Sequence, residues 1–135
     1  MYGARLITVL ILLPIMAAVT GCSNYGERIK IDDHVEIYFK PPVTKSEAIK
    51  VGAWVSTRRN ESARDATIQV LKEGRVYQLR ACLRDGVEID AHLKAACRRW
   101  ASEVSKVLDG ATVEWHICGA SLQDTKLIIF MDDFD

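Results

Sequence analysis

The sequence predicts an α+β domain of the ferredoxin-like type, in which two split βαβ units in tandem place two helices on one face of an antiparallel sheet. Alternating apolar and polar residues predict strands, and two longer runs with apolar residues at three- and four-residue steps predict helices. The expected order is strand, helix, strand, strand, helix, strand, plus an extra C-terminal edge strand. The residues on the predicted buried faces of the two helices match at an offset of 45 residues: Ala48 with Leu93, Gly52 with Cys97, and Val55 with Trp100. Chance similarity between two βαβ-like patterns is the alternative, and it leaves the α+β class unchanged.

The first strand is predicted from the alternation of apolar and polar side chains over residues 35–39. Ile29 and Ile31 extend this alternation backward, either within one longer strand or as a hairpin arm that turns at Asp32-Asp33. Pro41-Pro42 ends the strand, because proline has no amide hydrogen for strand pairing.

The first helix is expected to begin at Thr44-Lys45-Ser46-Glu47, which has the pattern of a capping box. The Thr44 hydroxyl can accept a hydrogen bond from the third helical amide, while the Glu47 carboxylate reaches back toward the helix start. The buried stripe of this helix is predicted to contain Ala48, Val51, Gly52 and Val55.

The second half begins with a strand over residues 66–72, in which Ile68 and Val70 point inward. Glu73-Gly74 is a turn signal before a further strand over residues 77–83. These two strands are therefore expected to form a hairpin.

The second helix is predicted over residues 90–108, and Gly110 lies where a C-terminal cap is expected. Its apolar face contains Leu93, Cys97, Trp100, Val104 and Val107. A strand over residues 113–117 follows, and residues 127–131 form the predicted extra edge strand.

The N-terminus has the three parts of an export signal. Arg5 supplies the positive start, and residues 6–19 form an apolar run of about 14 residues, within the usual range for such a segment. A helix that spans a bilayer needs about 20 residues. The segment Val19-Thr20-Gly21-Cys22, which closes the run, resembles the lipobox of bacterial lipoproteins. The resemblance implies that diacylglycerol is attached to the Cys22 thiol and that a dedicated peptidase cuts just before Cys22.

A second interpretation of this segment is an ordinary secretory signal that is cut near Ala17-Ala18 and leaves Cys22 as a disulfide cysteine. We favour the lipoprotein because it explains the apolar run, the small residues and the cysteine together. Acyl chains on Cys22 would make membrane lipid a partner, and two or three such chains anchor a protein stably in a membrane. Ser23 follows the cysteine where an inner-membrane retention signal would have aspartate, so in a host with two membranes we expect the outer one, with the domain facing the periplasm.

The expected domain organisation follows from the N-terminal signal and the predicted α+β domain. Residues 1–21 form the signal peptide that is removed, residues 22–27 form a lipid-anchored tether, residues 28–131 form a single α+β domain, and residues 132–135 form an acidic tail. The processed chain carries about 114 residues, a typical size for one domain.

The charge balance disfavours nucleic acid as a partner. The full chain has 18 basic and 18 acidic side chains, and removal of Arg5 leaves one acidic residue in excess. No basic field remains to bind phosphates. We expect no metal site, because the chain has neither a Cys-x-x-Cys nor a His-x-x-x-His pair, and we expect no cofactor.

Three cysteines follow Cys22, so at least one of them stays unpaired within a monomer. The spacing ranks a Cys82–Cys97 disulfide first, with no disulfide as the close alternative. Cys82 and Cys118 would have a third strand between them in a ferredoxin-like sheet. Their Cα atoms would then be about 9.6 Å apart, which is too far for a bond.

The predicted strands place polar side chains on the sheet face away from the helices: Glu36, Tyr38, Gln78, Arg80, Glu114 and His116. This face could be plain solvent surface or a partner surface, for which we single out Tyr38, Arg80, Glu114 and His116. We therefore expect a non-catalytic interaction module of the cell envelope rather than an enzyme. An inhibitor or immunity-type lipoprotein is the alternative, and a small metal-binding or enzymatic domain that uses His116 and Cys118 is a third class.

Overall fold

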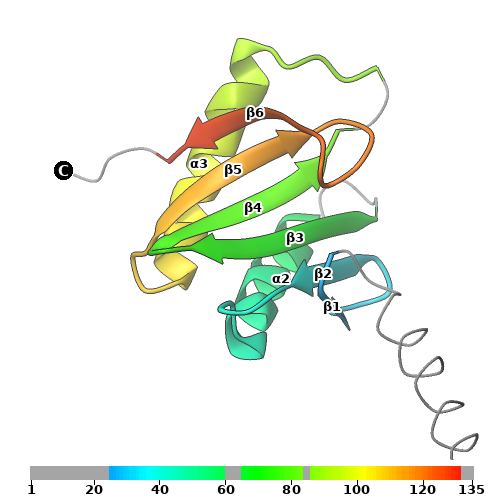
Figure 1. The fold of residues 1–135 in the computed structure, drawn as a ribbon. Helices are drawn as coiled ribbons and strands as arrows, with labels where there is room; N and C mark the ends of the chain where they lie inside the picture. Colours follow the sequence, from blue (N-terminus) through cyan, green and yellow to red (C-terminus); the bar gives the residue numbers. More distant parts are fainter. Residues whose placement is uncertain (1–24, 60–64, 84–85, 132–135) are drawn as a thin grey trace, which may run out of the picture.

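The computed structural model describes residues 25–59, 65–83 and 86–131, which form one mixed six-stranded sheet and two helices (Figure 1). The elements in chain order are β1 (Glu27–Lys30), β2 (Val35–Phe39), α2 (Lys45–Arg59), β3 (Ala66–Glu73), β4 (Val76–Cys82), α3 (Ala91–Val107), β5 (Thr112–Cys118) and β6 (Thr125–Phe130). The strands follow one another across the sheet in the same order as in the sequence. The class is therefore α+β, as predicted.

The topology differs from the predicted ferredoxin-like arrangement. β2 pairs directly with β3 and β4 pairs directly with β5, both in parallel, so neither βαβ unit is split by an inserted strand. The remaining pairs, β1–β2, β3–β4 and β5–β6, are antiparallel. The sheet is thus mixed rather than antiparallel.

Both helices cover the same face of this sheet. The ribbon shows α2 and α3 on one side of the strands (Figure 1). Their side chains form one core with β2 to β5, and Trp54 of α2 and Trp100 of α3 both contact Trp115 of β5. The parallel strands β2 and β3 run in the opposite direction to the parallel strands β4 and β5. The connection through α2 and the connection through α3 nevertheless both lead toward the β6 edge of the sheet. One of the two crossovers must therefore be left-handed, although about 98% of such connections are right-handed.

Local sequence signals account for the ends of the helices. The capping box forms as predicted: the Glu47 amide donates to Thr44 Oγ1 at 3.2 Å, and the Thr44 amide donates to Glu47 Oε1 at 2.9 Å. Asp90 caps α3 by accepting from the Leu93 amide at 2.8 Å. At its other end the Gly110 amide, in a backbone conformation with φ 82°, donates to the Ser105 carbonyl.

The core lies between the sheet and the two helices. Val35, Ile37, Val70 and Leu79 are almost fully buried on the strands, as predicted from the alternation. Gly52 allows α2 to pack closely against the β1–β2 turn and β2, because a Cβ atom there would lie 2.4 Å from Cγ1 of Ile31 and 3.1 Å from Cγ1 of Ile37.

The ends of the domain differ in part from expectation. Residues before β2 form a separate hairpin arm, β1, and residues 125–130 form the predicted additional edge strand, β6. Tyr25, which we assigned to the tether, is already part of the folded domain, because its carbonyl accepts from Gln69 Nε2 at 3.0 Å. The predicted signal peptide, Cys22 and the acidic tail at 132–135 lie outside the described residues. No helix within the described residues has the length and apolar character that crossing a bilayer requires.

Candidate functional site

The sheet face opposite the helices carries a row of polar side chains in register across the strands. Tyr38 pairs with Gln69, Gln69 with Arg80, and Arg80 with His116, which pairs in turn with Ile128. We call this side of the sheet the open face, and its other members include Glu36, Thr67, Gln78, Glu114 and Phe130. The structure thus brings together all four residues of the predicted interaction face.

The middle of the open face is covered by other parts of the chain. The Tyr25 ring packs edge-on against Tyr38 with their centroids 5.5 Å apart. From the other side, the Leu122 carbonyl accepts from Arg80 Nη1 at 3.3 Å, and Leu122 itself is buried. His116 is only 3% exposed, so this part of the open face is not plain solvent surface.

Three polar atoms in the row have no hydrogen-bond partner among the described residues: Gln69 Oε1, Arg80 Nε and His116 Nδ1. The other ring nitrogen of His116 lies 3.0 Å from Glu114 Oε2. An unsatisfied buried polar group costs about 1–3 kcal/mol, and these three atoms are buried, so a partner at the surface does not reach them.

Two shallow hollows lie at the end of the sheet where β2 and β3 begin and β4 ends. One, of about 420 Å³, is lined by residues that include Tyr25, Tyr38, Cys82 and Leu122. The other, of about 230 Å³, is lined by residues that include Arg28, Lys30, Asp32 and His34. Glu36, Asp65 and Thr67 line both hollows.

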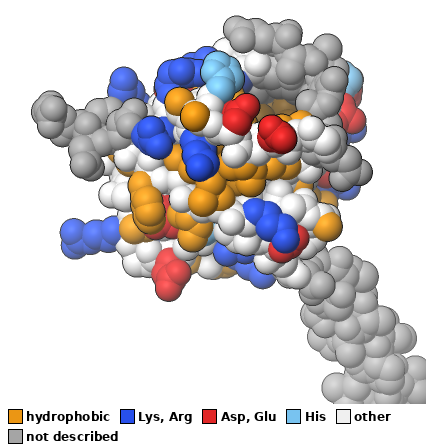
Figure 2. Space-filling view, turned by 90° about the horizontal axis from the view of Figure 1, so that it is seen from above, with side chains coloured by type: hydrophobic (Ala, Val, Ile, Leu, Met, Phe, Trp, Pro, Cys, Tyr) orange, Lys and Arg blue, Asp and Glu red, His pale blue; other side chains and the backbone are white. Residues whose placement is uncertain are grey.

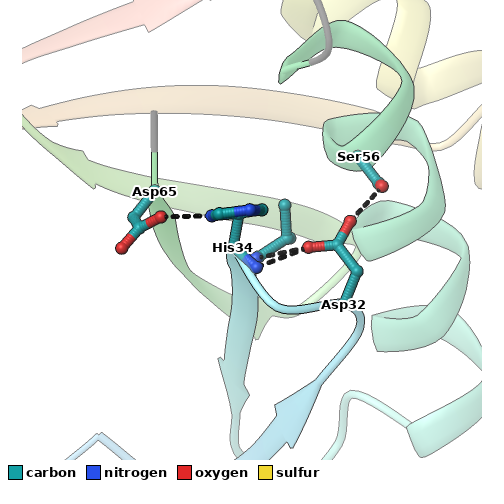
Figure 3. Close-up of polar contacts among 5 residues, drawn as sticks. Asp32, His34, Ser56 and Asp65 are labelled. Carbon is teal, nitrogen blue, oxygen red and sulfur yellow. Dashed lines mark hydrogen bonds and ion pairs between the residues drawn. The ribbon is translucent and has the colours of Figure 1, made fainter. Parts of the chain in front are cut away.

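His34, Asp32 and Asp65 line the second hollow, and Ser56 of α2 contacts Asp32 from beside it (Figure 3). His34 Nδ1 lies 2.7 Å from Asp65 Oδ1, and both side chains are largely exposed. Ser56 donates its hydroxyl hydrogen to Asp32, and Asp32 also accepts from the amides of His34 and Val35. The serine therefore contacts a carboxylate rather than the imidazole, and these contacts do not form the nucleophile–base pair of a hydrolase.

Sequence reasoning missed this cluster. Its members come from the β1–β2 turn, the helix α2 and the start of β3, so no local spacing connects them. The one local signal is Asp32, two residues before His34, because an aspartate in a turn often accepts from the amide two residues on.

The three cysteines of the domain are free thiols. The predicted Cys82–Cys97 disulfide is not formed, because Cys97 belongs to the core on the helix side while Cys82 lies on the open face. Burial raises the pKa of the Cys97 thiol to about 11. Cys82 and Cys118 are direct neighbours on β4 and β5, so the predicted third strand between them does not exist.

Cys118 and His116 are close in sequence but do not form a metal site. The Cys118 thiol is 3.6 Å from the carbonyl oxygen of His116 and 3.5 Å from that of Leu122, both weak hydrogen-bond contacts. In the described part of the chain, no three His, Cys, Asp or Glu side chains are grouped so that they could hold a metal ion.

The edge strand β6 exposes apolar side chains on the open face. Ile128 and Phe130 are 41% and 65% exposed, and they pair with His116 and Glu114. Figure 2, which looks down on the end of the molecule where β6 lies in Figure 1, shows hydrophobic side chains gathered in a strip with charged side chains around it. An exposed edge strand with apolar residues offers both backbone hydrogen bonds and apolar area to another protein.

Residues 28–130 match the model of one protein family, described as the AF_1994_N family N-terminal domain. The match covers every strand and both helices except for the first residue of β1. No curated protein matches the chain significantly. No solved structure does so either.

Proposed function

The chain belongs to the family whose model is described as the AF_1994_N family N-terminal domain. We propose that it is a lipid-anchored, non-catalytic interaction module of the bacterial cell envelope. In this proposal Cys22 carries the lipid, and the domain presents its open face and the β6 edge to a partner protein. The host membrane is the outer one where two exist, with the domain in the periplasm.

The observation that carries the interaction role is the exposure of Phe130 and Ile128 on an edge strand. Large apolar side chains that are exposed side by side are typical of protein-binding surfaces. Arg80 and Tyr38, residue types that are frequent at the centres of interfaces, lie in the adjoining row of the same face.

A non-catalytic role is supported by the contacts of the two clusters that contain histidine. His34 faces a single exposed carboxylate, and the nearby serine donates to a different one. His116 is buried against Glu114, and the neighbouring Cys118 thiol contacts backbone carbonyls. Neither arrangement pairs a nucleophile with a base.

Site-specific photo-cross-linking in living cells tests the interaction role. A photoreactive amino acid placed at Phe130 or Ile128 should give one dominant adduct with an envelope protein, and Phe130→Glu should reduce an adduct formed from position 128 at least fivefold. Ile49 is the matched control, because it is 44% exposed but lies on α2, on the other side of the sheet. Equal adducts from positions 49 and 130, or none from 128 and 130, would contradict the proposal.

The same adduct separates the proposal from the inhibitor or immunity-type alternative. If the cross-linked partner is an enzyme whose activity falls in a one-to-one complex, the chain is an inhibitor. A structural or assembly protein as partner supports the envelope module.

The lipid anchor has its own test. Mass spectrometry of the N-terminal peptide from the membrane fraction should show an acylated Cys22, and Cys22→Ser should move the chain out of that fraction. A mature N-terminus at a residue other than Cys22 would overturn the lipid anchor. It would not bear on the interaction surface, which the cross-linking experiment tests.

A further inference from the structure

Cys82 and Cys118 are the last residues of β4 and β5, and they lie directly opposite each other in the parallel pair. Neighbouring strands are about 4.8 Å apart, which is within the range of Cα separations that disulfides span. Both side chains point to the open face, because each is two residues beyond a member of the polar row, Arg80 or His116.

We propose that Cys82 and Cys118 form a disulfide bond that ties the C-terminal ends of β4 and β5 together. Both residues end their strands, where the backbone can adjust the Cβ separation without breaking the central pairing. The bond closes a loop of about 37 residues that includes α3. Closing a long loop restricts the unfolded chain and so stabilises the folded state.

The two thiols differ in exposure in a way that gives them separate roles. Cys82 is exposed and can meet an oxidant, whereas Cys118 is buried directly beside it. Burial, and then the negative charge of Asp124, raise the pKa of the Cys82 thiol. Burial is also the main cause that raises the pKa of Cys118, so bond formation should speed up as the pH rises.

The oxidant belongs to the class of small or protein disulfides. The Cys82 thiolate attacks one sulfur of that disulfide, which releases the other sulfur as a thiolate and leaves Cys82 in a mixed disulfide. The Cys118 thiolate then attacks the Cys82 sulfur, forms the intramolecular bond and releases the second thiolate. The two protein thiols lose two protons and two electrons in total, and the oxidant becomes two thiols.

Cys97 is not an alternative partner for either thiol. It is 1% exposed and lies on the helix side of the sheet, so the sheet itself separates it from Cys82 and Cys118. Cys97 therefore stays reduced, and it serves as an internal control.

Peptide mapping of the full chain, purified in detergent and equilibrated with oxidised glutathione, tests the bond. Trypsin places the three cysteines on separate peptides, residues 81–84, 95–98 and 107–126. We expect peptide 81–84 to be joined to peptide 107–126, and Cys97 to be recovered as a thiol. Oxidation should also raise the melting temperature by roughly 10 °C.

The variant Cys97→Ala should keep both the joined peptide and the rise in melting temperature, and Cys82→Ser should lose both. Recovery of Cys82 as a stable mixed disulfide with glutathione while Cys118 remains a thiol would overturn the inference, as would a link from either residue to Cys97. Mapping of the unsubstituted chain decides the question even if a variant fails to fold.

The occurrence of this bond in cells rests on the proposed function, because it requires an oxidising compartment outside the cytosol. The disulfide pairing and the proposed export can fail separately. A bond that forms in glutathione but is absent from chain trapped in cells by rapid alkylation supports the pairing and counts against export. Failure in glutathione counts against the pairing alone.

Discussion

Trp54 of α2 and Trp115 of β5 meet edge to face, with their ring centroids 6.2 Å apart. On its other side Trp115 contacts Trp100 of α3, at 5.6 Å between ring centroids. A single residue of the sheet therefore touches both helices. Because the two helices cover different parallel pairs, this contact joins the two βαβ units into one core.

Replacement of this central ring should destabilise the whole domain. We expect Trp115→Ala to lower the free energy of unfolding by about 3–5 kcal/mol, since it removes a large buried side chain and leaves a cavity. Trp115→Phe should cost clearly less. Urea unfolding of reduced protein measures the difference, with Ile49→Ala as a surface control that should change stability by at most about 0.5 kcal/mol. Equal losses for Trp115→Ala and Ile49→Ala would show that the ring contact does not join the units.

Gly52 should resist the substitution that usually strengthens a helix. Alanine inside a helix is about 1 kcal/mol more favourable than glycine, but here its Cβ atom would lie 2.4 Å from Cγ1 and 2.5 Å from Cδ1 of Ile31. We expect Gly52→Ala to lower stability by about 1–3 kcal/mol because of this overpacking. Adding Ile31→Ala should recover part of that loss, and a double-mutant cycle measures the coupling. If the effects of Gly52→Ala and Ile31→Ala on stability were additive, the close contact between α2 and Ile31 would be contradicted.

The cluster in Figure 3 should prove structural rather than chemical. Asp32 accepts from the amides of His34 and Val35, at 2.7 and 2.8 Å, and from the Ser56 hydroxyl. We expect Asp32→Ala to cost about 2 kcal/mol, because it leaves several donors without an acceptor. His34→Ala should cost at most about 0.5 kcal/mol, since the ion pair with Asp65 is exposed. Thermal unfolding of the two variants provides the comparison, and a larger loss for His34→Ala would reverse this assignment.

The buried thiol of Cys97 should make stability depend on pH in the alkaline range. Burial raises its pKa from 9.0 to about 11, so the folded state holds this proton more tightly than the unfolded state does. The stabilisation is fully present below pH 9.0 and is lost as the pH rises through about 11. The cost of Cys97→Ala should therefore shrink by about 2 kcal/mol between pH 7 and pH 10.5. Denaturant unfolding of both proteins at each pH measures this change, and a constant difference would contradict it.

The local elements could be predicted because their signals are contained in short stretches of chain. The capping box at Thr44 and Glu47 depends on hydrogen bonds across three residues, and it forms where the pattern indicates. The alternation that marks β2 likewise depends only on the period of a strand. The two exposed side chains of β6 could not be found in this way, because residues 127–131 form a continuous apolar run without alternation.

The candidate site could be predicted only in part. Alternation placed Tyr38, Arg80, Glu114 and His116 on one face, and strand pairing confirms that they share it. Their exposure was not predictable, because Tyr25 and Leu122 cover the row through contacts with Gln69 and Arg80, which are 44 and 42 residues away in the sequence. The His34 cluster was missed for the same reason.

By itself, the sequence determined the class, the order of the elements and the face on which the residues of β2 to β5 lie, because periodicity and caps act over a few residues. Only the tertiary structure decided which strands are neighbours. If both crossovers were right-handed, two helices on one face would favour the ferredoxin-like arrangement, in which each βαβ unit is split by an inserted strand. In this chain β2 stays next to β3 and β4 stays next to β5, and one crossover is left-handed. That choice depends on how the shared core around Trp115 packs, and the same choice places Cys82 beside Cys118.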